Sequence, residues 1–249
     1  MRSSEQPTIS VIVCAYNEAA YLPACLHALL AQARPADEII VVDNASTDGT
    51  AALARAIPGV RVIHEPTRGL VTARETGRTA ARGDILAYVD ADCRPPLSWL
   101  EKVERRFTRR PALVAVTGPY RFFDWSLAGR ALIRAYDLIV APPTHLAVHH
   151  GLGIGAILYG GNFAVRREAL ARINGFDRSI EFHGEDTNLG RRLTPLGQVD
   201  VALECWVWTS ARRYRAMGTR RVIGLYVRNF WSEILRHRPA DRTHVDVRA

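Results

Sequence analysis

Short apolar runs alternate with helical patterns through the first half of the chain. The runs are rich in β-branched residues and lie at Ile9–Cys14, Glu38–Val42, Val60–His64 and Ile85–Val89. Helical spacing of apolar positions fills the intervals at Ala19–Ala33, Thr47–Ala56 and Leu70–Ala81. Such alternation is typical of a parallel sheet covered by helices. The pattern therefore predicts an α/β fold built on a Rossmann-like, mostly parallel central sheet flanked by helices.

The second half of the chain has a less regular pattern. Further strands are predicted at Ala112–Gly118 and Val199–Leu203. Gly160–Val165 leads into a helix around Arg167–Ile173, and helices are also predicted within Gly184–Leu196 and at Thr219–Arg236. The stretch Leu138–Val165 carries no charge but contains Pro142, Pro143 and several glycines. Because a membrane span needs about 20 mostly apolar residues in an unbroken helix, we expect an irregular segment here and no span.

One domain is expected to fill residues 1–249. Its nucleotide- and metal-binding half would occupy 8–118 and its acceptor-binding half 119–217, followed by an amphipathic helix at 218–238 and a mobile tail at 239–249.

Composition and charge limit the classes of binding partner that are expected. The formal net charge is +8, and Lys102 is the only lysine, so nearly all basic charge is arginine. Arginine matches phosphate oxygens in two-point contacts, which suits a diphosphate or an anionic lipid, although codon bias explains the same excess. The arginines are scattered, whereas nucleic-acid binding needs a basic stripe, so no nucleic-acid partner is expected. Four scattered cysteines and no secretory signal predict a cytoplasmic protein.

Polar residues follow three of the predicted strands. They are Ala15-Tyr16-Asn17-Glu18, Asp43-Asn44 and Asp90-Ala91-Asp92. Ligands of open parallel sheets bind beyond the carboxyl ends of the strands, although Asp and Asn there also simply form turns. The chain has neither a G-x-G-x-x-G after its first strand nor a P-loop. Asp90 and Asp92 can aim at one hard cation, and oxygen ligands of this kind suit Mg²⁺ or Mn²⁺.

Five segments in order carry a resemblance to a known family. TISVIVCAYNEAAYLPACLHALLAQ, EIIVVDNASTDGT, RGLVTARETG, ILAYVDADCRPP and GEDTNLGRRL resemble family 2 glycosyltransferases of the GT-A fold, from about Thr8 to Arg215. The resemblance implies an inverting transfer of sugar from a nucleotide-diphosphate sugar with a divalent metal. It gives Asp186 the role of general base, with Glu185 positioning the acceptor or its loop. It makes Asp92 the metal ligand, with Asp90 beside the ribose and the metal.

The same resemblance assigns the donor-binding residues. They are Ala15, Tyr16, Glu18, Asp43 and Asn44 for the nucleoside, Arg74, Asp90 and Ala91 for the donor nucleotide, Gly161 and Asn162 beside the donor sugar, and Arg212 and Arg215 for the diphosphate. Asn44 stands where many members carry an acid, so a UDP-sugar is favoured only weakly. Arg212 and Ala216 replace the Gln and Trp of processive members, which puts processive synthesis in doubt.

The acceptor is expected to be a carbohydrate or a lipid-linked molecule. The last helix carries an apolar face made of Ile223, Tyr226, Val227, Phe230, Trp231 and Ile234, with arginines on its flanks. This face either packs on the domain or rests on an anionic membrane. The second alternative would place the protein at the inner face of the cytoplasmic membrane.

Two other functions are alternatives to glycosyl transfer. A sugar nucleotidyltransferase would carry a glycine- and basic-rich loop after the first strand, where this chain has Ala15-Tyr16-Asn17-Glu18. A non-catalytic sugar-nucleotide-binding protein on the same fold has no need of Asp90, Asp92 and Asp186 together. His145, His149 and His150 lack nearby acids in the sequence and are expected to pack rather than to bind a metal.

Overall fold

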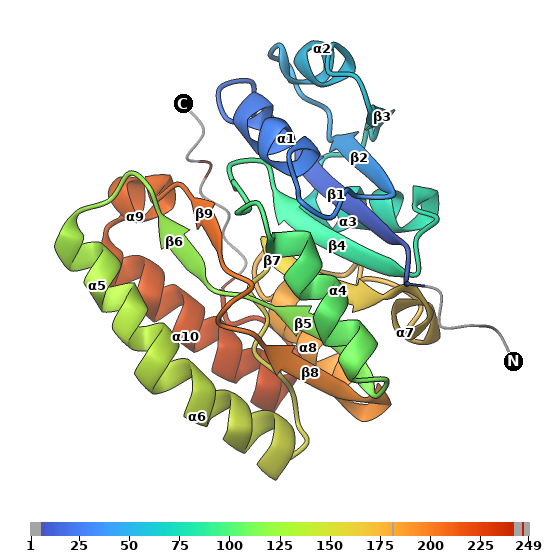
Figure 1. Ribbon diagram of the computed structural model, residues 1–249. Helices are drawn as coiled ribbons and strands as arrows, with labels where there is room; N and C mark the ends of the chain where they lie inside the picture. Colours follow the sequence, from blue (N-terminus) through green and yellow to red (C-terminus); the bar gives the residue numbers. More distant parts are fainter. Residues whose placement is uncertain (1–5, 181, 242–245, 247–249) are drawn as a thin grey trace, which may run out of the picture.

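The protein is built on a seven-stranded sheet with the order β3-β2-β1-β4-β7-β5-β8 (Figure 1). The computed structural model describes residues 6–180, 182–241 and 246. The strands are β1 (Ile9–Ala15), β2 (Glu38–Asp43), β3 (Val60–His64), β4 (Ile85–Asp90), β5 (Leu113–Thr117), β7 (Asn162–Arg166) and β8 (Gln198–Val201). Only β7 pairs antiparallel to its neighbours, so the predicted mostly parallel sheet is confirmed.

Helices cover both faces of the sheet and divide the core in two. Val11 and Val13 of β1 point to the face that packs against α1 (Leu22–Leu30) and α4 (Trp99–Arg109). Ile12, between them, joins the opposite core with α3 (Leu70–Ala80), α7 (Arg167–Arg172) and α8 (Glu185–Leu193). This alternation is the two-residue period of a strand that is buried on both faces. Helix α2 (Thr50–Arg55) packs beside β3 at the edge of the sheet.

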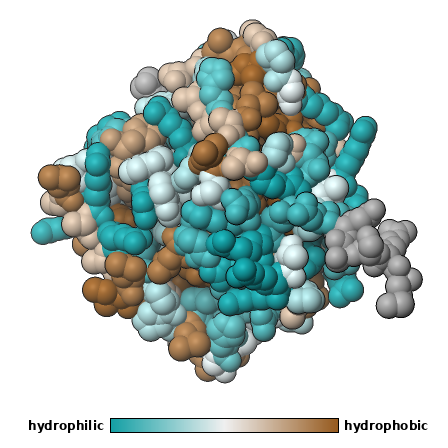
Figure 2. Space-filling model, in the orientation of Figure 1, coloured by the Kyte–Doolittle hydropathy of each residue, from teal (hydrophilic) through white to brown (hydrophobic). Residues whose placement is uncertain are grey.

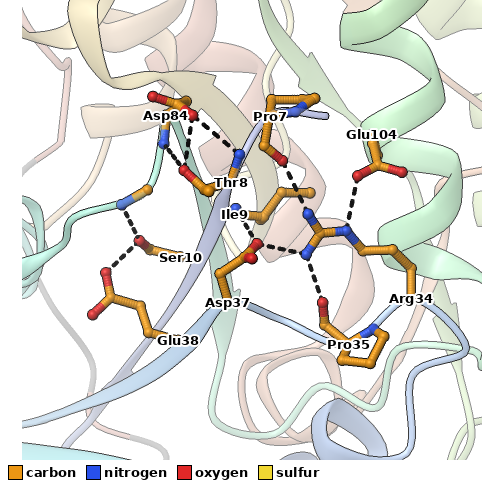
Figure 3. Close-up of polar contacts among 11 residues, drawn as sticks. Pro7, Thr8, Ile9, Ser10, Arg34, Pro35, Asp37, Glu38, Asp84 and Glu104 are labelled. Carbon is orange, nitrogen blue, oxygen red and sulfur yellow. Dashed lines mark hydrogen bonds and ion pairs between the residues drawn. The ribbon is translucent and has the colours of Figure 1, made fainter. Parts of the chain in front are cut away.

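Charged groups at the amino ends of the strands are satisfied by one another (Figure 3). Arg34 binds Glu104 at 2.9 Å, Asp37 at 2.7 Å and the carbonyl of Pro7 at 2.9 Å. Asp84 accepts hydrogen bonds from the amide and the hydroxyl of Thr8. These contacts hold the start of the sheet together, and the groups available to a ligand lie at its carboxyl edge.

The uncharged stretch is helical as far as Gly151, where an irregular segment was expected, and residues 152–161 are irregular as expected. Before this helix, β6 (Tyr120–Phe122) pairs with β9 (Val207–Thr209) in a separate two-stranded sheet. The helix then runs through α5 (Leu127–Ala135), the π-helical turn η1 (Tyr136–Val140), α6 (Ala141–His145) and the π-helical turn η2 (Leu146–Gly151). Pro142 and Pro143 stand at the start of α6, directly after the π-helical turn η1, and the helix continues through them.

The C-terminal helix α10 (Thr219–Arg236) follows α9 (Arg212–Met217) and packs on α8 and α9. Its buried side chains include Val222 and Leu225, whereas Tyr226, Val227 and Trp231 are exposed. The predicted apolar face therefore does not pack on the domain as a whole. Within the described residues, none of the helices is long and apolar enough to cross a bilayer. Most of the predicted tail, at 242–245 and 247–249, lies outside the described residues.

Candidate functional site

The register of the sheet brings the three polar strand ends together. Ala15 at the end of β1 lies opposite Asp43 at the end of β2, and Cys14 lies opposite Asp90 at the end of β4. All three strands run parallel, so the residues that follow them emerge at one edge. The sequence predicted this convergence from the order of the strands alone.

Asp92 lies at the centre of this edge beside a guanidinium. The carboxylate is 8% exposed and lies 3.2 Å from Nε of Arg212. The two terminal nitrogens of Arg212 bind Glu18, one of them at 2.9 Å. Thr209 donates to Asp92 from β9 at 3.3 Å. Arg212, at the start of α9, thus links residues that follow β1 and β4.

Asp90 and the acid pair Glu185–Asp186 meet at two glycines. A Cβ added to Gly161 would lie 2.1 Å from Oδ2 of Asp90, so any side chain here would displace Asp90. A Cβ on Gly160 would lie 3.1 Å from Oε1 of Glu185 and 3.3 Å from Oδ2 of Asp186. The carboxylates that follow β4 and those that begin α8 therefore flank the same dipeptide.

Arg74 connects these two groups of acids. It is buried, donates to Glu185 at 2.7 Å and to the carbonyl of Gly160, and lies 4.0 Å from Asp90. Coulombic attraction from Glu185 and Asp90 raises the pKa of its guanidinium against the opposing effect of burial. Its contacts are to the acids of the site, which makes it a residue that positions them.

The side chains of Asp43 and Asn44 differ in what they leave available. Oδ2 of Asp43 contacts Nδ1 of His64 at 3.1 Å, whereas its buried Oδ1 has no hydrogen-bond partner. Asn44 donates to the carbonyls of Glu65 and Thr67 and accepts from the amide of Gly69. Its amide is thus committed to the β3–α3 loop. Asp43 offers a free acceptor.

Tyr16 lies beneath a cation that the sequence analysis did not single out. The guanidinium carbon of Arg68 is 4.2 Å from the centre of the Tyr16 ring. Ala15 and Ala91, by contrast, are buried and offer only backbone groups to a ligand. Tyr16 and Asp43 thus lie at the carboxyl ends of the neighbouring strands β1 and β2.

Two predicted binding residues are directed elsewhere. Asn162 accepts from Nε1 of Trp99 at 3.0 Å and donates to the carbonyls of Gly118 and Cys205, each at 2.8 Å. With 1% exposure and a fully used amide, its side chain holds strands together and does not face a ligand. Arg215 binds Asp124 at 3.0 Å, away from the contacts of Asp92. Arg212 is the arginine of this segment that reaches the acids.

The two central carboxyls have raised pKa values. Burial is the main cause for both, and it brings the pKa of Asp92 and of Asp186 to about 7. Arg212 opposes the rise at Asp92, whereas Glu185 adds to it at Asp186. A carboxyl with a pKa near neutrality is a competent proton acceptor.

The donor set at this edge suits a hard divalent cation. Asp90, Asp92 and Glu18 bring three carboxylates to one region, and Arg212 is the cation that already lies among them. Carboxylate oxygens are the ligands that Mg²⁺ and Mn²⁺ prefer. Asp92 with Asp90 would hold such an ion, because the side chain of Asp90 is half exposed at this edge.

The histidines of the long helix form a cluster of a different kind. Within the described residues, His145, His149 and His150 are the one set of three candidate metal ligands whose ligand atoms lie within 4.8 Å of one another. Both ring nitrogens of His145 contact backbone groups, those of Val199 and Ile157. His149 accepts from the amide of Val199 and contacts Thr194. His145 and His149 thus bind the long helix to β8, in agreement with the expectation that these histidines pack within the protein.

Asp137 is a buried acid that the sequence analysis missed. It lies in η1 with 1% exposure, accepts from the hydroxyl of Tyr159 at 2.6 Å, and has no partner for Oδ2. Burial raises its pKa to about 6. Tyr159 directly precedes the Gly160–Gly161 dipeptide, so this acid borders the site. Asp137 stands in no short sequence motif that could have indicated its position beside the site.

Comparison with known proteins identifies relatives of this chain. The sequence model of Glycosyl transferase family 2 matches residues 10–173. Glycosyltransferase AglE of Haloferax volcanii is 40% identical over 202 residues, which cover 78% of this chain and 64% of that protein. The uncharacterized glycosyltransferase EpsJ of Bacillus subtilis is 28% identical over 71% of this chain and 53% of its own. The chain thus spans less than two thirds of the length of these relatives.

Solved structures share the fold. The mannosyltransferase PcManGT from Pyrobaculum calidifontis, in complex with GDP-Man and Mn²⁺, has a TM-score of 0.68 at 23% identity over 94% of this chain and 65% of its own. Glucosyl-3-phosphoglycerate synthase from Mycobacterium tuberculosis, in complex with Mn²⁺, UDP and phosphoglyceric acid, has a TM-score of 0.65 at 24% identity over 92% and 78%. The fold is GT-A, as the resemblance implied. The chain belongs to glycosyl transferase family 2.

Proposed function

We propose that the protein transfers a sugar from a nucleotide-diphosphate sugar to an acceptor hydroxyl or phosphate, with inversion at the anomeric carbon. One observation carries the proposal: the Gly160–Gly161 dipeptide has Asp90 on one side and Glu185–Asp186 on the other. A donor held by the first group presents its sugar to the second. A binding protein without turnover has no need of this juxtaposition.

Asp186 acts as the general base in this proposal. Inversion requires one in-line displacement, in which the acceptor oxygen loses its proton as it attacks the anomeric carbon. With a pKa of about 7, Asp186 takes that proton at neutral pH and releases it afterwards. General-base help is typically worth about 10²–10⁴ in rate. Glu185, fixed by Arg74 at 2.7 Å, positions the loop beside the base.

Asp92 and Asp90 hold the divalent cation, Mn²⁺ or Mg²⁺. A bound cation neutralises charge that develops on the departing nucleoside diphosphate. Arg212 binds the same diphosphate, since its guanidinium already lies between Asp92 and Glu18. Mn²⁺ is present in the solved complexes of PcManGT and glucosyl-3-phosphoglycerate synthase, which supports this assignment.

The base of the donor is read by Asp43. Its unpartnered Oδ1 can accept a ring N–H, and both uracil and guanine carry one. The weak preference for UDP rested on Asn44, whose amide is used by the β3–α3 loop, so that residue favours neither base. GDP-Man and UDP in the solved neighbours support testing both nucleotides first.

A donor panel tests the function. UDP- and GDP-sugars are mixed with Mn²⁺ or Mg²⁺, and stabilisation and release of nucleoside diphosphate are measured with a mixed carbohydrate and lipid-phosphate acceptor set. The wild type is expected to release one diphosphate in a metal-dependent way. Asp186→Asn should bind the same nucleotide and lose transfer by at least ~10²-fold. Transfer by Asp186→Asn at the wild-type rate, or binding without any turnover, would refute the catalytic proposal.

A further inference from the structure

The long helix from α5 to η2 exposes an unusual amount of apolar surface. Sixteen large hydrophobic residues are exposed in the described part of the chain, and thirteen of them lie in two segments. Nine are in residues 127–154: Leu127, Leu132, Tyr136, Leu138, Ile139, Val140, Leu146, Leu152 and Ile154. Four are in α10: Tyr226, Val227, Trp231 and Leu235. Apolar surface concentrated in this way marks an interaction site.

The two segments lie side by side. Figure 1 shows α10 running along α5 and α6, and a Cβ on Gly155, just after η2, would lie 2.2 Å from Cδ1 of Ile234. In Figure 2, brown side chains are distributed along the left and lower left edge, over α5 and α6, whereas the centre of this view is hydrophilic. We call residues 127–154 and the exposed edge of α10 the apolar helix surface.

Every exposed charge on these two segments is positive. Residues 127–154 contain Arg130 and Arg134, both exposed, and one acid, Asp137, which is buried. Helix α10 contains one acid, Glu233, with 0% exposure. Its exposed charged residues are Arg220, Arg221, Arg228 and Arg236. An anionic surface complements this distribution, whereas a second copy of the chain, docked about a two-fold axis, would bring arginines against arginines.

The apolar helix surface borders the catalytic end of the protein. Helix α10 packs on α8, whose first turn carries Glu185 and Asp186. Asp137 of η1 accepts from the hydroxyl of Tyr159, which directly precedes Gly160, and a Cβ on Gly160 would lie 3.3 Å from Oδ2 of Asp186. A molecule anchored along the two helices can reach the acid pair without crossing the domain.

We propose that the apolar helix surface lies in the interface of an anionic membrane and presents a lipid-linked acceptor to Asp186. Leucine, isoleucine and aromatic side chains enter the head-group region, and the arginines meet lipid phosphates. The proposed membrane docking depends only on the features of the apolar helix surface. The identity of the acceptor rests on the proposed glycosyl transfer.

Vesicle sedimentation tests the docking. The full chain is mixed with vesicles of phosphatidylcholine, with or without phosphatidylglycerol, at low and at 0.5 M salt. Binding is expected only with the anionic lipid, with a loss of about tenfold at high salt because screening weakens charge attraction. No binding to anionic vesicles at low salt would overturn the proposal.

Matched variants assign the binding to this surface. Ile139→Glu with Leu146→Glu changes two residues that are 69% and 61% exposed, and should lower vesicle affinity at least tenfold. Leu53→Glu with Leu97→Glu changes two exposed leucines elsewhere and should leave it unaltered. Arg130→Ala with Arg134→Ala should weaken binding on the order of fivefold per arginine. Equal binding by the first pair and the wild type would refute the assignment.

Two further measurements separate the alternatives. Light scattering would reveal a dimer. If the wild type is a dimer that does not bind vesicles, and Ile139→Glu with Leu146→Glu makes it a monomer, the surface is the interface with a second copy. Thermal stabilisation by nucleoside diphosphate and Mn²⁺ should be the same in all these variants. In the wild type, nucleotide binding without vesicle binding would refute the docking alone, whereas vesicle binding without nucleotide binding would refute the proposed function alone.

Discussion

Nε of Arg212 lies 3.2 Å from Oδ2 of Asp92, and the rest of the same guanidinium binds Glu18. Two buried carboxylates from the loops after β1 and β4 thus share one positive charge. Removal of one partner from a buried charge cluster is strongly destabilising, typically by about 3–5 kcal/mol, because it leaves the other charges uncompensated. Arg212 therefore stabilises the free protein at the position where the cation is proposed to bind.

Arg212→Ala should lower the melting temperature. Mn²⁺ should then raise the melting temperature of this variant by more than it raises that of the wild type. The ion would replace the positive charge that Asp92 and Glu18 have lost. Melting curves across a Mn²⁺ series check this, with Arg215→Ala as the control, since Arg215 contacts Asp124 instead. Equal Mn²⁺ responses in Arg212→Ala and the wild type would contradict the shared site.

Asp186→Asn should raise stability at pH 8 and leave it nearly unchanged near pH 4. The pKa of Asp186 is about 7 in the folded protein and near 3.8 when exposed, so folding favours the protonated form. Wild-type stability therefore falls as pH rises from about 4 to 7, by about 1.4 kcal/mol for each unit of pKa difference. The amide does not titrate and escapes this loss. Urea unfolding at several pH values measures it, and a variant less stable than the wild type at pH 8 would contradict the buried charge.

Gly161→Ala should fold and lose donor binding. Its Cβ would lie 2.1 Å from Oδ2 of Asp90 and 2.9 Å from the hydroxyl of Tyr120, so Asp90 must turn away from the site. Gly224→Ala in α10 is the matched control, because nothing lies within 4 Å of its Cβ. This second change should add up to ~1 kcal/mol through helix propensity. Titration of nucleoside diphosphate with Mn²⁺ distinguishes them, and unaltered affinity in Gly161→Ala would show that Asp90 is not a ligand.

His149→Gln should make the protein less sensitive to acid. Burial, with help from His145 and His150, lowers the pKa of His149 to about 4, whereas a bond to the backbone of Gly155 opposes the shift. A histidine with a depressed pKa contributes stability that is present above its unfolded value, about 6.5, and is lost as pH falls towards 4. Glutamine can still accept from the amide of Val199 but does not titrate over this range.

The comparison for His149→Gln is the slope of unfolding free energy between pH 7 and 4.5. His27→Gln is a control on a different helix, α1. If the wild type and His149→Gln show the same slope, the histidines of the long helix do not hold β8 in the way their contacts indicate.

Sequence patterns predicted the first half of the fold well because its strands are unbroken apolar runs. β1 and β2 follow directly from Ile9–Cys14 and Glu38–Val42, and their parallel order places the polar strand ends together. The long helix was missed because Pro142 and Pro143 usually end helices, and here they occupy a first turn after a π-helical turn. Local rules do not foresee a change of helical period.

The sequence predicted which acids lie near the carboxyl edge of the sheet, but not the direction of the neighbouring side chains. Asp90, Asp92 and Asp186 lie where the motifs indicated, whereas the amides of Asn44 and Asn162 turn towards backbone groups. Such choices depend on which carbonyls are left without partners after folding. The pairing of Arg212 with Asp92 joins positions far apart in the chain, and no local pattern encodes it.

Calorimetric titration of UDP and of GDP, each with Mn²⁺ or with EDTA, tests the central claim most directly. The wild type should bind one of them with Mn²⁺ and at least tenfold more weakly with EDTA. Asp92→Asn should bind weakly under both conditions, and Asp200→Asn, which alters an acid paired with Arg106, should match the wild type. Nucleotide affinity that depends neither on Mn²⁺ nor on Asp92 would contradict a metal-assisted glycosyl transfer at this edge of the sheet.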